Sequence, residues 1–566
     1  MTEENTVEGA GSQGVSRRTI MKGAAWTVPA LMVATSAPAY ALSCVQGKWN
    51  ALGRGKMLSG GLFNLNLDSL ASVDGVIASA PTQVGGIAGS GYKHGPNGEG
   101  DPDIHANPLS VTALQGVNVT ATGLTNVAVS NLLGLVLDAN VGAVNQYAFA
   151  QSIGLSKGAS GYVDNNGDLK VTAPNNYPEV ANIDLAQMLK PLLGGNLTGA
   201  LAGITNLNLH VGAVVGRAIL EQMCNTVVNP AGYKLHRDYL LAYLKLVLTS
   251  PLLAALQKAV RDSVVSNANL AVDTTALLNA LNQIPVLGPV VTALIAVAAQ
   301  PTVKLTASPG AINSALQATP IGSGGPIELN LGSNPLTITV DVASLLGPAF
   351  PGGASDLANA LPANSILFVD YHVPANALTN FIATVQNDII TRIASSVSVE
   401  ISYSIAGGLT TLKIAGTLAS LLAGTATITA TLLGAPVING SVTNPALALV
   451  GNIVKGGLLA PGSLIDVALQ NVFGANGLLQ AVFTALESVL NLTVNVQNLP
   501  EKNNDPAKPY KHTPGPARWN TGPQALPAGQ YDVAALGLSA AQILASPNVL
   551  DLFLARGSVG PHTPKP

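Results

Sequence analysis

The pattern that most constrains the fold of this chain is an apolar, helix-like stretch followed at once by an alternating, strand-like stretch. The clearest case begins at Leu378. Apolar residues from there to Ile393 recur at intervals of three and four, which places them on one face of a helix. Apolar and polar residues then alternate over 397–405, the period of a strand with one buried face. Gly407-Gly408 predicts the hairpin turn that follows.

The same order of helix and strand occurs twice more. The apolar stretch 478–490 precedes alternation at 492–496, and the apolar stretch 286–299 precedes Val303 and Leu305. An amphipathic helix must bury its apolar stripe and a half-buried strand must bury one face, so elements in this order cover one another. The sequence therefore predicts an α+β fold: antiparallel, β-rich sheets with amphipathic helices packed along them, in an elongated architecture of several sections.

Strand patterns dominate the first half of the chain. Residues 117–122 alternate between apolar and polar, and 161–171 predicts a hairpin whose turn lies at Asn166-Gly167, where a positive φ is easily adopted. The last strand candidate, over 550–557, contains Leu-Ala-Arg-Gly, and the first contains Leu-Gly-Arg-Gly at 52–55. From this similarity we expect the two ends of the chain to lie side by side.

The middle of the chain is predicted to be helical. The stretch from Tyr239 to Leu248 is apolar almost all round, and Ser250 then caps a further helix that has Pro251 at its first position. The most apolar stretch, 284–299, holds two prolines and is shorter than the roughly 20 residues that cross a bilayer as a helix. We expect it to form a buried core helix, and we expect no transmembrane segment.

The N-terminus has the parts of a twin-arginine export signal. Arg17-Arg18 and Lys22 precede an apolar stretch over 23–32, and Ala39-Tyr40-Ala41 offers small residues where a signal peptidase cleaves. This pattern predicts that the Tat translocase exports the chain already folded. The predicted sections are listed here: 1–41, signal peptide; 42–230, β-rich; 231–330, helix-rich; 331–499, helix and strand; 500–530, Pro-rich loop; 531–566, C-terminal strands.

Charge excludes one class of partner. Charged residues make up 10% of the chain and the formal net charge is −3, whereas soluble domains average about 25% charged residues. Threonine, serine, asparagine and glycine must therefore cover most of the surface. No basic cluster follows the signal, so we expect no nucleic-acid partner.

The two cysteines allow three interpretations. Cys44 and Cys224 both lie in the exported part, where an oxidising compartment favours a disulfide between them. The second interpretation is a pair of free thiols. The third is a lipid on Cys44, although Leu42-Ser43 stands in the reverse of the order that lipoprotein signals use.

Two short motifs match catalytic or metal-binding patterns only in part. Gly154-Leu155-Ser156-Lys157-Gly158 has the spacing of a hydrolase nucleophile turn, but a hairpin pattern follows where a helix is required. Asp164, Asn166 and Asp168 have the first spacings of a calcium loop, but Leu169 stands where that loop needs glycine. We interpret the first match as chance and the second as a hairpin turn.

Three further features are candidate sites. Asp370 and His372 are two residues apart on a predicted strand, so both side chains would leave the same face and could start a metal site or a base-and-orienter pair. Threonines alternate over 425–431, a ladder that can bind ordered water or glycans, although a plain exposed strand gives the same string. The apolar helices at 239–299 and 478–490 could line a lipid groove. None of these features identifies a catalytic, cofactor-binding or metal residue, and we expect no cofactor.

Several short segments, in the same order along the chain, resemble the actinobacterial choice-of-anchor G family of exported surface proteins. They are SRRTIMKGAAWTVPAL (16–31), GRGKMLSGGLFNLNLDSLASVDGV (53–76), NPLSVTAL (107–114), GAVNQYAFA (142–150), NLTVNVQN (491–498) and DLFLARGSVGP (551–561). The resemblance implies a Gram-positive envelope or secreted protein without an established activity, whose members differ in how the C-terminus is attached. The string nearest to a sortase signal, LPAGQ at 526–530, lacks its threonine. We therefore expect release or non-covalent retention.

The leading hypothesis is a secreted or cell-surface protein, not an enzyme, that acts in adhesion or envelope interaction. Its partner would be a component of the cell envelope or of a host surface. One alternative is a secreted hydrolase that uses Asp370 and His372. The other is an extracellular lipid carrier, which requires an enclosed apolar cavity between helices and sheet.

Overall fold

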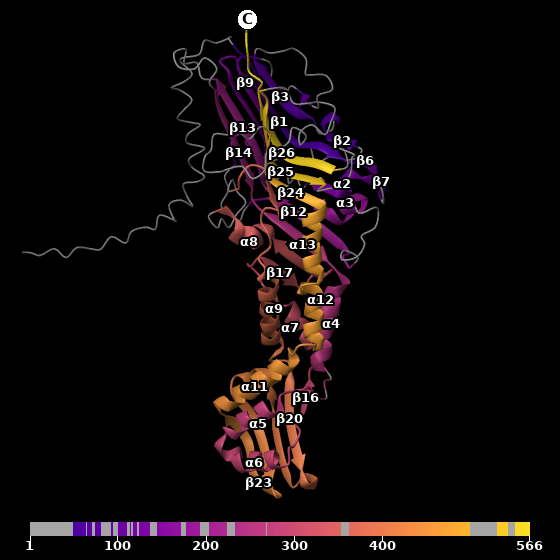
Figure 1. The fold of residues 1–566 in the computed structure, drawn as a ribbon, viewed down its shortest axis with the longest axis vertical. Coiled ribbons are helices and arrows are strands. Elements are labelled where there is room, and N and C mark those ends of the chain that lie inside the picture. The colour runs from indigo at the N-terminus through magenta and orange to yellow at the C-terminus, as the bar shows by residue number, and fades with distance from the viewer. Residues whose placement is uncertain are drawn as a thin grey trace, which may run out of the picture.

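Alternating apolar residues build four large sheets, and apolar helices cover two of them in the computed structural model (Figure 1). A sandwich of two sheets forms one end of an elongated molecule, a helix-covered sheet forms the middle, and a second helix-covered sheet forms the far end. The predicted α+β fold of antiparallel sheets with packed helices is confirmed. The structure describes residues 49–565 except 64, 71–73, 81–91, 94–99, 110–113, 115–116, 122–123, 136–143, 171–176, 193–202, 223–232, 266, 268, 352–360, 499–528 and 541–549.

The signal peptide, both cysteines and almost all of the Pro-rich loop lie outside the described residues. The structure therefore leaves the three interpretations of Cys44 and Cys224 open.

The sandwich unites the two ends of the chain. Its larger sheet has the order β19-β24-β25-β26-β1-β3-β4, and its smaller sheet has the order β14-β13-β10-β9-β5. Strands of the larger sheet are β1 (Trp49–Leu62), β3 (Gly75–Ala80), β4 (Tyr92–Lys93), β19 (Ser365–Leu367), β24 (Leu490–Gln497), β25 (Tyr531–Ala540) and β26 (Leu550–Val559), with β2 (Leu65–Asn66) and β27 (Thr563–Pro564) paired to β1. Strands of the smaller sheet are β5 (Asp103–Pro108), β9 (Asn145–Gln151), β10 (Leu155–Gly161), β13 (Val214–Gln222) and β14 (Tyr233–Leu241).

The first and last long strands are neighbours. β1 pairs antiparallel with β26, with Gly55 opposite Gly557 and Leu58 opposite Leu554. The expectation that the two ends of the chain lie side by side is confirmed.

Glycines bring the backbones of the two sandwich sheets into direct contact. A Cβ atom added to Gly55 would lie 2.2 Å from the carbonyl oxygen of Ala159, and one added to Gly216 would lie 2.0 Å from that of Ala555. Ordinary sandwiches hold side chains between sheets about 10 Å apart. At these glycines there is room only for hydrogen, so the two sheets pack more closely.

The middle section packs helices on a six-stranded sheet of order β17-β18-β15-β12-β11-β8. The strands are β8 (Leu133–Leu135), β11 (Glu179–Asp184), β12 (Asn206–Gly212), β15 (Leu244–Thr249), β17 (Ile327–Asn330) and β18 (Thr337–Asp341). The longer helices are α4 (Pro251–Val265), α7 (Pro309–Gln317), α9 (Ala377–Ile393), α12 (Leu464–Phe473) and α13 (Leu478–Val489). Smaller elements are α2 (Val129–Leu132), α3 (Leu185–Leu192), α8 (Val342–Leu346), β6 (Asn118–Ala121) and β7 (Leu124–Ala128).

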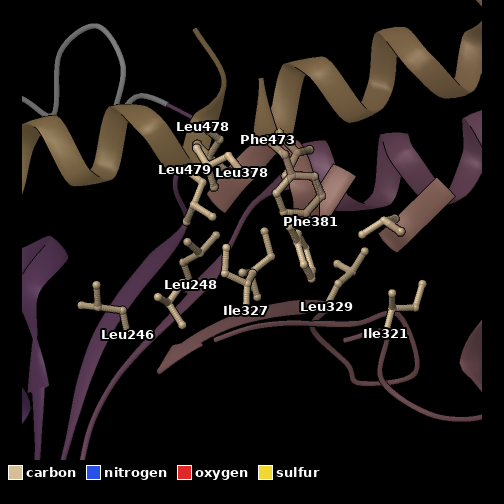
Figure 2. Close-up of a cluster of buried hydrophobic side chains, with 14 of the residues drawn as sticks. Leu246, Leu248, Ile321, Ile327, Leu329, Leu378, Phe381, Phe473, Leu478 and Leu479 are labelled. Atoms are coloured by element: carbon tan, nitrogen blue, oxygen red, sulfur yellow. The ribbon is translucent and has the colours of Figure 1, made fainter. Parts of the chain in front are cut away.

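Apolar side chains fill the space between these helices and the sheet (Figure 2). Phe381 of α9 meets Phe473 of α12 edge to face, with ring centroids 5.0 Å apart. Leu246, Leu248 and Leu329 of the sheet point at this cluster and are fully buried.

The far section, here called the distal module, is a five-stranded sheet of order β16-β20-β21-β22-β23 with helices on one face. Its strands are β16 (Thr302–Thr306), β20 (Ser398–Ile405), β21 (Thr410–Thr417), β22 (Thr425–Leu432) and β23 (Ala435–Thr443). Its helices are α5 (Thr274–Asn282), the short η4 (Pro285–Leu287), α6 (Gly288–Ala296), α10 (Leu418–Leu422) and α11 (Pro445–Leu458). All three predicted helix-then-strand units are present: α9 leads to β20, α13 to β24 and α6 to β16.

Two helix predictions are wrong. The stretch 239–248 is not a helix, because β14 and β15 divide it between two different sheets. In β15, buried Leu246 and Leu248 flank the half-buried Val247, so the period is two. Apolar residues on both faces, interrupted only by Lys245, concealed it. The stretch 284–299 is not one buried helix: it breaks into η4 and α6, and Ile295 remains 49% exposed.

One described segment has the length and composition of a membrane span. Leu464–Val489, which combines α12 and α13, passes this test, and 56% of its most apolar window is buried inside the protein, as in the core helix of a folded domain. The pair α5 and η4–α6 has the length and composition of a membrane span only when the two helices are taken together. The chain bends by 110° between them.

Candidate binding face

The sheet of the distal module has one apolar and one hydroxyl-bearing face. Successive side chains of a strand point to opposite faces, and in β20, β21 and β22 every second residue is apolar. Ile401, Ile414 and Ile428 are fully buried on the face that carries the helices. The residues between them are partly or fully exposed on the opposite face.

Serine and threonine dominate that exposed surface, which we call the hydroxyl face. Its members are Thr302, Lys304, Thr306, Ser398, Glu400, Ser402, Ser404, Thr411, Lys413, Ala415, Thr417, Thr425, Thr427, Thr429, Thr431, Asn439, Ser441 and Thr443.

The strand register aligns these side chains in rows across the sheet. One row runs from Ser402 through Lys413 and Thr429 to Asn439. Within the rows, the Thr429 hydroxyl donates to Asn439 Oδ1 at 3.3 Å. The threonine ladder at 425–431 is therefore one column of a surface that spans five strands.

The hydroxyl face carries almost no net charge. Lys413 Nζ lies 2.7 Å from Glu400 Oε2, and Lys304 is the cross-strand neighbour of Glu400. Over 274–306 and 398–458 the sequence has one further charged residue, Lys455. Such a surface offers many hydrogen-bond donors and acceptors and little electrostatic attraction, a chemistry that suits an uncharged polar partner.

The sequence showed only part of this face. The ladder in β22 and the alternating serines of β20 were visible, but sequence alone does not say that the two strands share a sheet and a face. The signal that would have joined them is the recurrence of hydroxyl residues at alternate positions in four consecutive strand patterns from 398 to 443, interrupted by Glu400, Lys413, Ala415 and Asn439.

Asp370 and His372 do not form the predicted pair. The strand ends at Leu367, and Phe368 has a φ of 66°, so Asp370 lies on a turn and His372 lies beyond it, not on one strand face. Asp370 Oδ2 accepts a hydrogen bond from the Ile366 amide at 2.7 Å.

His372 instead faces a carboxylate on a neighbouring helix. Its Nδ1 lies 3.7 Å from Glu487 Oε1 of α13, and the two side chains are 70% and 51% exposed. They border a pocket of about 210 Å³, which is also lined by Phe368, Val373, Leu378, Gln480 and Phe483. These described lining residues include no serine or cysteine that could act as a nucleophile.

The structure brings Ser156 together with a histidine that the sequence did not associate with it. Ser156 Oγ lies 2.8 Å from His562 Nε2. Burial lowers the pKa of His562 to about 4, so the ring is neutral. Ser156 is fully buried within β10 and no helix follows it, while Nδ1 of His562 has no partner among the described residues. The pair lacks the exposed turn and the orienting acid of a hydrolase.

The predicted turn at Asn166-Gly167 is confirmed. Gly167 has a φ of 69°, and Asp164 Oδ1 accepts from the amides of Asn166 and Asp168. Asp168 Oδ1 lies 2.6 Å from Lys157 Nζ, so a lysine occupies the place that a cation would need. Across the described part of the chain, no group of three or more His, Cys, Asp or Glu could hold a metal ion.

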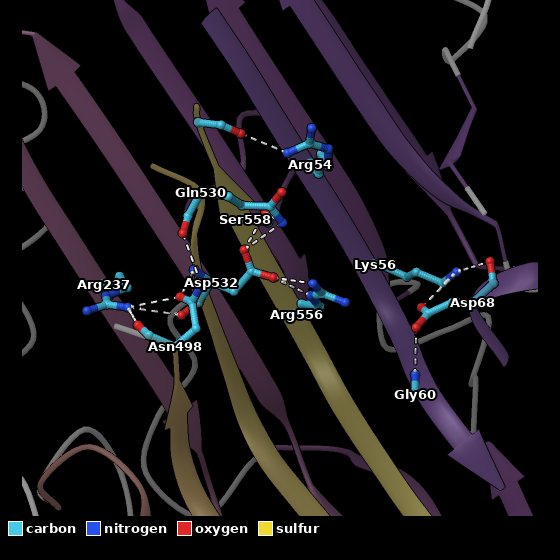
Figure 3. A network of polar contacts seen from close by, with 11 residues as sticks. Arg54, Lys56, Gly60, Asp68, Arg237, Asn498, Gln530, Asp532, Arg556 and Ser558 are labelled. Carbon is cyan, nitrogen blue, oxygen red and sulfur yellow. Dashed lines mark hydrogen bonds and ion pairs between the residues drawn. The ribbon is translucent and has the colours of Figure 1, made fainter. Parts of the chain in front are cut away.

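A buried polar network lies on the larger sheet of the sandwich (Figure 3). Asp532 is fully buried, pairs with Arg556 and accepts from the Ser558 hydroxyl at 2.6 Å. Burial lowers the pKa of Arg556, but the charges of Asp532, Tyr92 and Asp68 and the hydrogen bond to Asp532 together outweigh it, so the net pKa is raised. Burial also lowers the pKa of Lys56, against the opposing effect of Asp68. The contacts of Asp532 tie β25 to β26, and the ion pair of Lys56 with Asp68 ties β1 to the turn that follows it, which is a structural role.

Comparison with protein families identifies one match. A family model described as "Domain of unknown function (DUF8394)" matches residues 53–560, nearly the whole of the described chain. The comparison with curated proteins and the comparison with solved structures gave no match.

Proposed function

We propose that this chain, which belongs to the DUF8394 family of unknown function, is an exported, non-enzymatic surface or secreted protein that binds a component of the cell envelope or of a host surface. The hydroxyl face of the distal module is the contact surface in this proposal. Its role is adhesion or envelope interaction.

The observation that carries the proposal is the place and chemistry of the hydroxyl face. The face spans five strands, holds rows of hydroxyl groups and lies at the end of the molecule opposite the sandwich. Both ends of the described chain lie in that sandwich, where Trp49 of β1 pairs with Pro564 of β27. A binding surface at the far end is thus held away from the sandwich.

Export rests on the N-terminal pattern. The paired arginines, the apolar stretch after Lys22 and the small residues before Leu42 support export by the Tat translocase. The resemblance to choice-of-anchor G proteins supports the same location, outside a Gram-positive cell.

A secreted hydrolase is the second candidate function. The observation in its favour is that His372 and Glu487 border one pocket. The test is hydrolysis of a panel of chromogenic ester, glycoside and peptide substrates by the purified protein. Activity that His372→Ala abolishes would replace the binding proposal with this one.

Export is tested by fractionation of the producing culture into cytoplasm, membrane, wall and medium. We expect the protein in the wall or medium, and we expect the double variant Arg17→Lys/Arg18→Lys in the cytoplasm. Normal secretion of that variant would overturn the export assignment.

Binding is tested by sedimentation of purified protein with envelope fragments or host cells. In Thr427→Val/Thr429→Val two hydroxyls of the hydroxyl face become methyl groups, and valine suits a strand, so the fold should persist. We expect this variant to bind more weakly. The matched control, Thr384→Val/Thr391→Val, removes two exposed hydroxyls from α9 and should bind as the wild type does. Equal binding by both variants would contradict the proposal.

A further inference from the structure

The far end of the distal module carries a group of exposed apolar side chains, here called the apolar tip. Its members and their exposed fractions are Val286 (50%), Ile295 (49%), Val297 (55%), Leu409 (53%) and Leu433 (79%). They belong to η4, to the end of α6 and to the two hairpin turns of the sheet.

These segments converge at one end of the sheet. The turn after β20 and the turn after β22 are in contact, because the Gly434 amide donates to the Leu409 carbonyl at 2.6 Å. β16 begins just after α6, and its first residue pairs with Ser402, three residues before the end of β20. α6 and the start of β23 lie at the lower extremity of the molecule in Figure 1.

Leu433 occupies a backbone conformation that does not suit leucine. It has a φ of 51° and Gly434 has a φ of 84°, so the two-residue hairpin loop has a positive φ at both positions. Asparagine or aspartate is the usual first residue of such a turn, and leucine is strained there. Among the described residues, the side chain of Leu433 is also the most exposed of the large apolar ones, at 79%. Folding gains nothing from leucine at this position, which favours a contact outside the molecule.

The segments that form the apolar tip contain no charged residue. None of 274–303, 401–412 and 414–454 has an Asp, Glu, Lys, Arg or His. The pair α5 and η4–α6 is apolar enough to pass as a membrane span, but its bend of 110° prevents it from crossing a bilayer as one helix. Apolar segments that cannot span can still lie in the interface of a lipid layer.

We propose that the apolar tip inserts into the interfacial region of a lipid surface whose headgroups carry no net charge. The side chains stand on turns and on a helix end at an extremity, so they protrude. A fluid lipid layer can bury a protruding tip without a complementary pocket, whereas a protein partner would need one. The hydroxyl face behind the tip would then meet the polar headgroups. This inference rests on the proposed function and names lipid as a partner class.

The test is co-flotation of the purified protein with phosphatidylcholine vesicles at low and at high salt. Burial of apolar area does not depend on salt, so we expect equal binding under the two conditions. We expect the vesicle binding of Leu409→Asp/Leu433→Asp to be weaker than that of the wild type by a factor of about ten or more. The control Leu464→Asp/Val467→Asp adds the same two charges to α12, where the two side chains are 58% and 48% exposed, and should leave vesicle binding unchanged.

A second variant separates folding from binding. Leu433→Asn relieves the strained turn, so its melting temperature should be equal to or above that of the wild type while its vesicle binding falls. Vesicle binding that is unchanged in both tip variants would overturn the inference. So would binding that needs anionic lipid and disappears at high salt, or a wild-type dimer that the tip variants make monomeric. If vesicles fail to bind and envelope fragments still do, the lipid inference fails and the proposed function stands.

Discussion

Glycine contacts between the sandwich sheets predict a large effect for a single methyl group. In Gly55→Ala the added Cβ would lie 2.2 Å from the Ala159 carbonyl oxygen and 2.6 Å from that of Tyr147. Both atoms are backbone, so no side chain can rotate away. An ordinary contact of 3.4 Å requires the sheets to separate by about 1.2 Å at this point. Overpacking costs about 1–3 kcal/mol, and because neighbouring contacts also loosen we expect the upper end, about 3 kcal/mol.

The readout is hydrogen exchange by segment, since a chain of several sections does not unfold as one unit. Peptides from β1, β9 and β10 should exchange faster in Gly55→Ala, and peptides from the distal module should not change. The matched control is Gly456→Ala in α11, where an added Cβ meets nothing within 4 Å and where alanine should stabilise the helix by about 0.5–1 kcal/mol. Unchanged exchange in the sandwich of Gly55→Ala would refute direct backbone contact between the sheets.

Three further perturbations test buried groups. Because burial holds the pKa of His562 at about 4, against 6.5 in an unfolded chain, the unfolded state takes up a proton first and stability should fall as the pH drops from 6.5 towards 4. The melting temperature against pH should show this fall, and His562→Gln should remove it. Asp532→Asn removes the charge that pairs with Arg556 and should lower the opening free energy of β25 and β26, measured by hydrogen exchange, by about 3–5 kcal/mol, an effect that Asp262→Asn, at an exposed pair, should not reproduce. Phe381→Ala should lower the opening free energy of the middle section, measured by hydrogen exchange, by about 3–5 kcal/mol. A double-mutant cycle with Phe473→Ala should give a coupling energy of about 0.5–1.5 kcal/mol. Strict additivity would contradict the edge-to-face contact.

Periodicity predicted the elements whose neighbours are close in sequence. The apolar positions proposed from Leu378 to Ile393 are all buried in α9, together with Ile390, which the pattern did not include. Gly407-Gly408 turns between β20 and β21 with φ values of 68° and 94°. Ser250 accepts from the Leu252 amide at the start of α4, as its place before Pro251 predicted. Local patterns suffice in these cases because the same residues decide both the conformation and the buried face.

The remaining features depend on contacts between distant residues. In the strand at 244–249 the apolar Val247 stands on the half-buried face, so the segment lacks a clean alternation and periodicity did not distinguish it from a helix. Ser156 and His562 are 406 residues apart and carry no joint signal. The hydroxyl face was visible strand by strand, but the sheet order that joins its columns is a property of the tertiary fold.

The most direct test of the binding account is hydrogen exchange of the purified protein with and without the envelope or host-surface preparation that it sediments with. The account predicts slower exchange in β20 to β23 and in the turns at Leu409 and Leu433, with no change in the sandwich. Slower exchange confined to the sandwich, or to the pocket beside His372, would place the contact elsewhere and contradict the account.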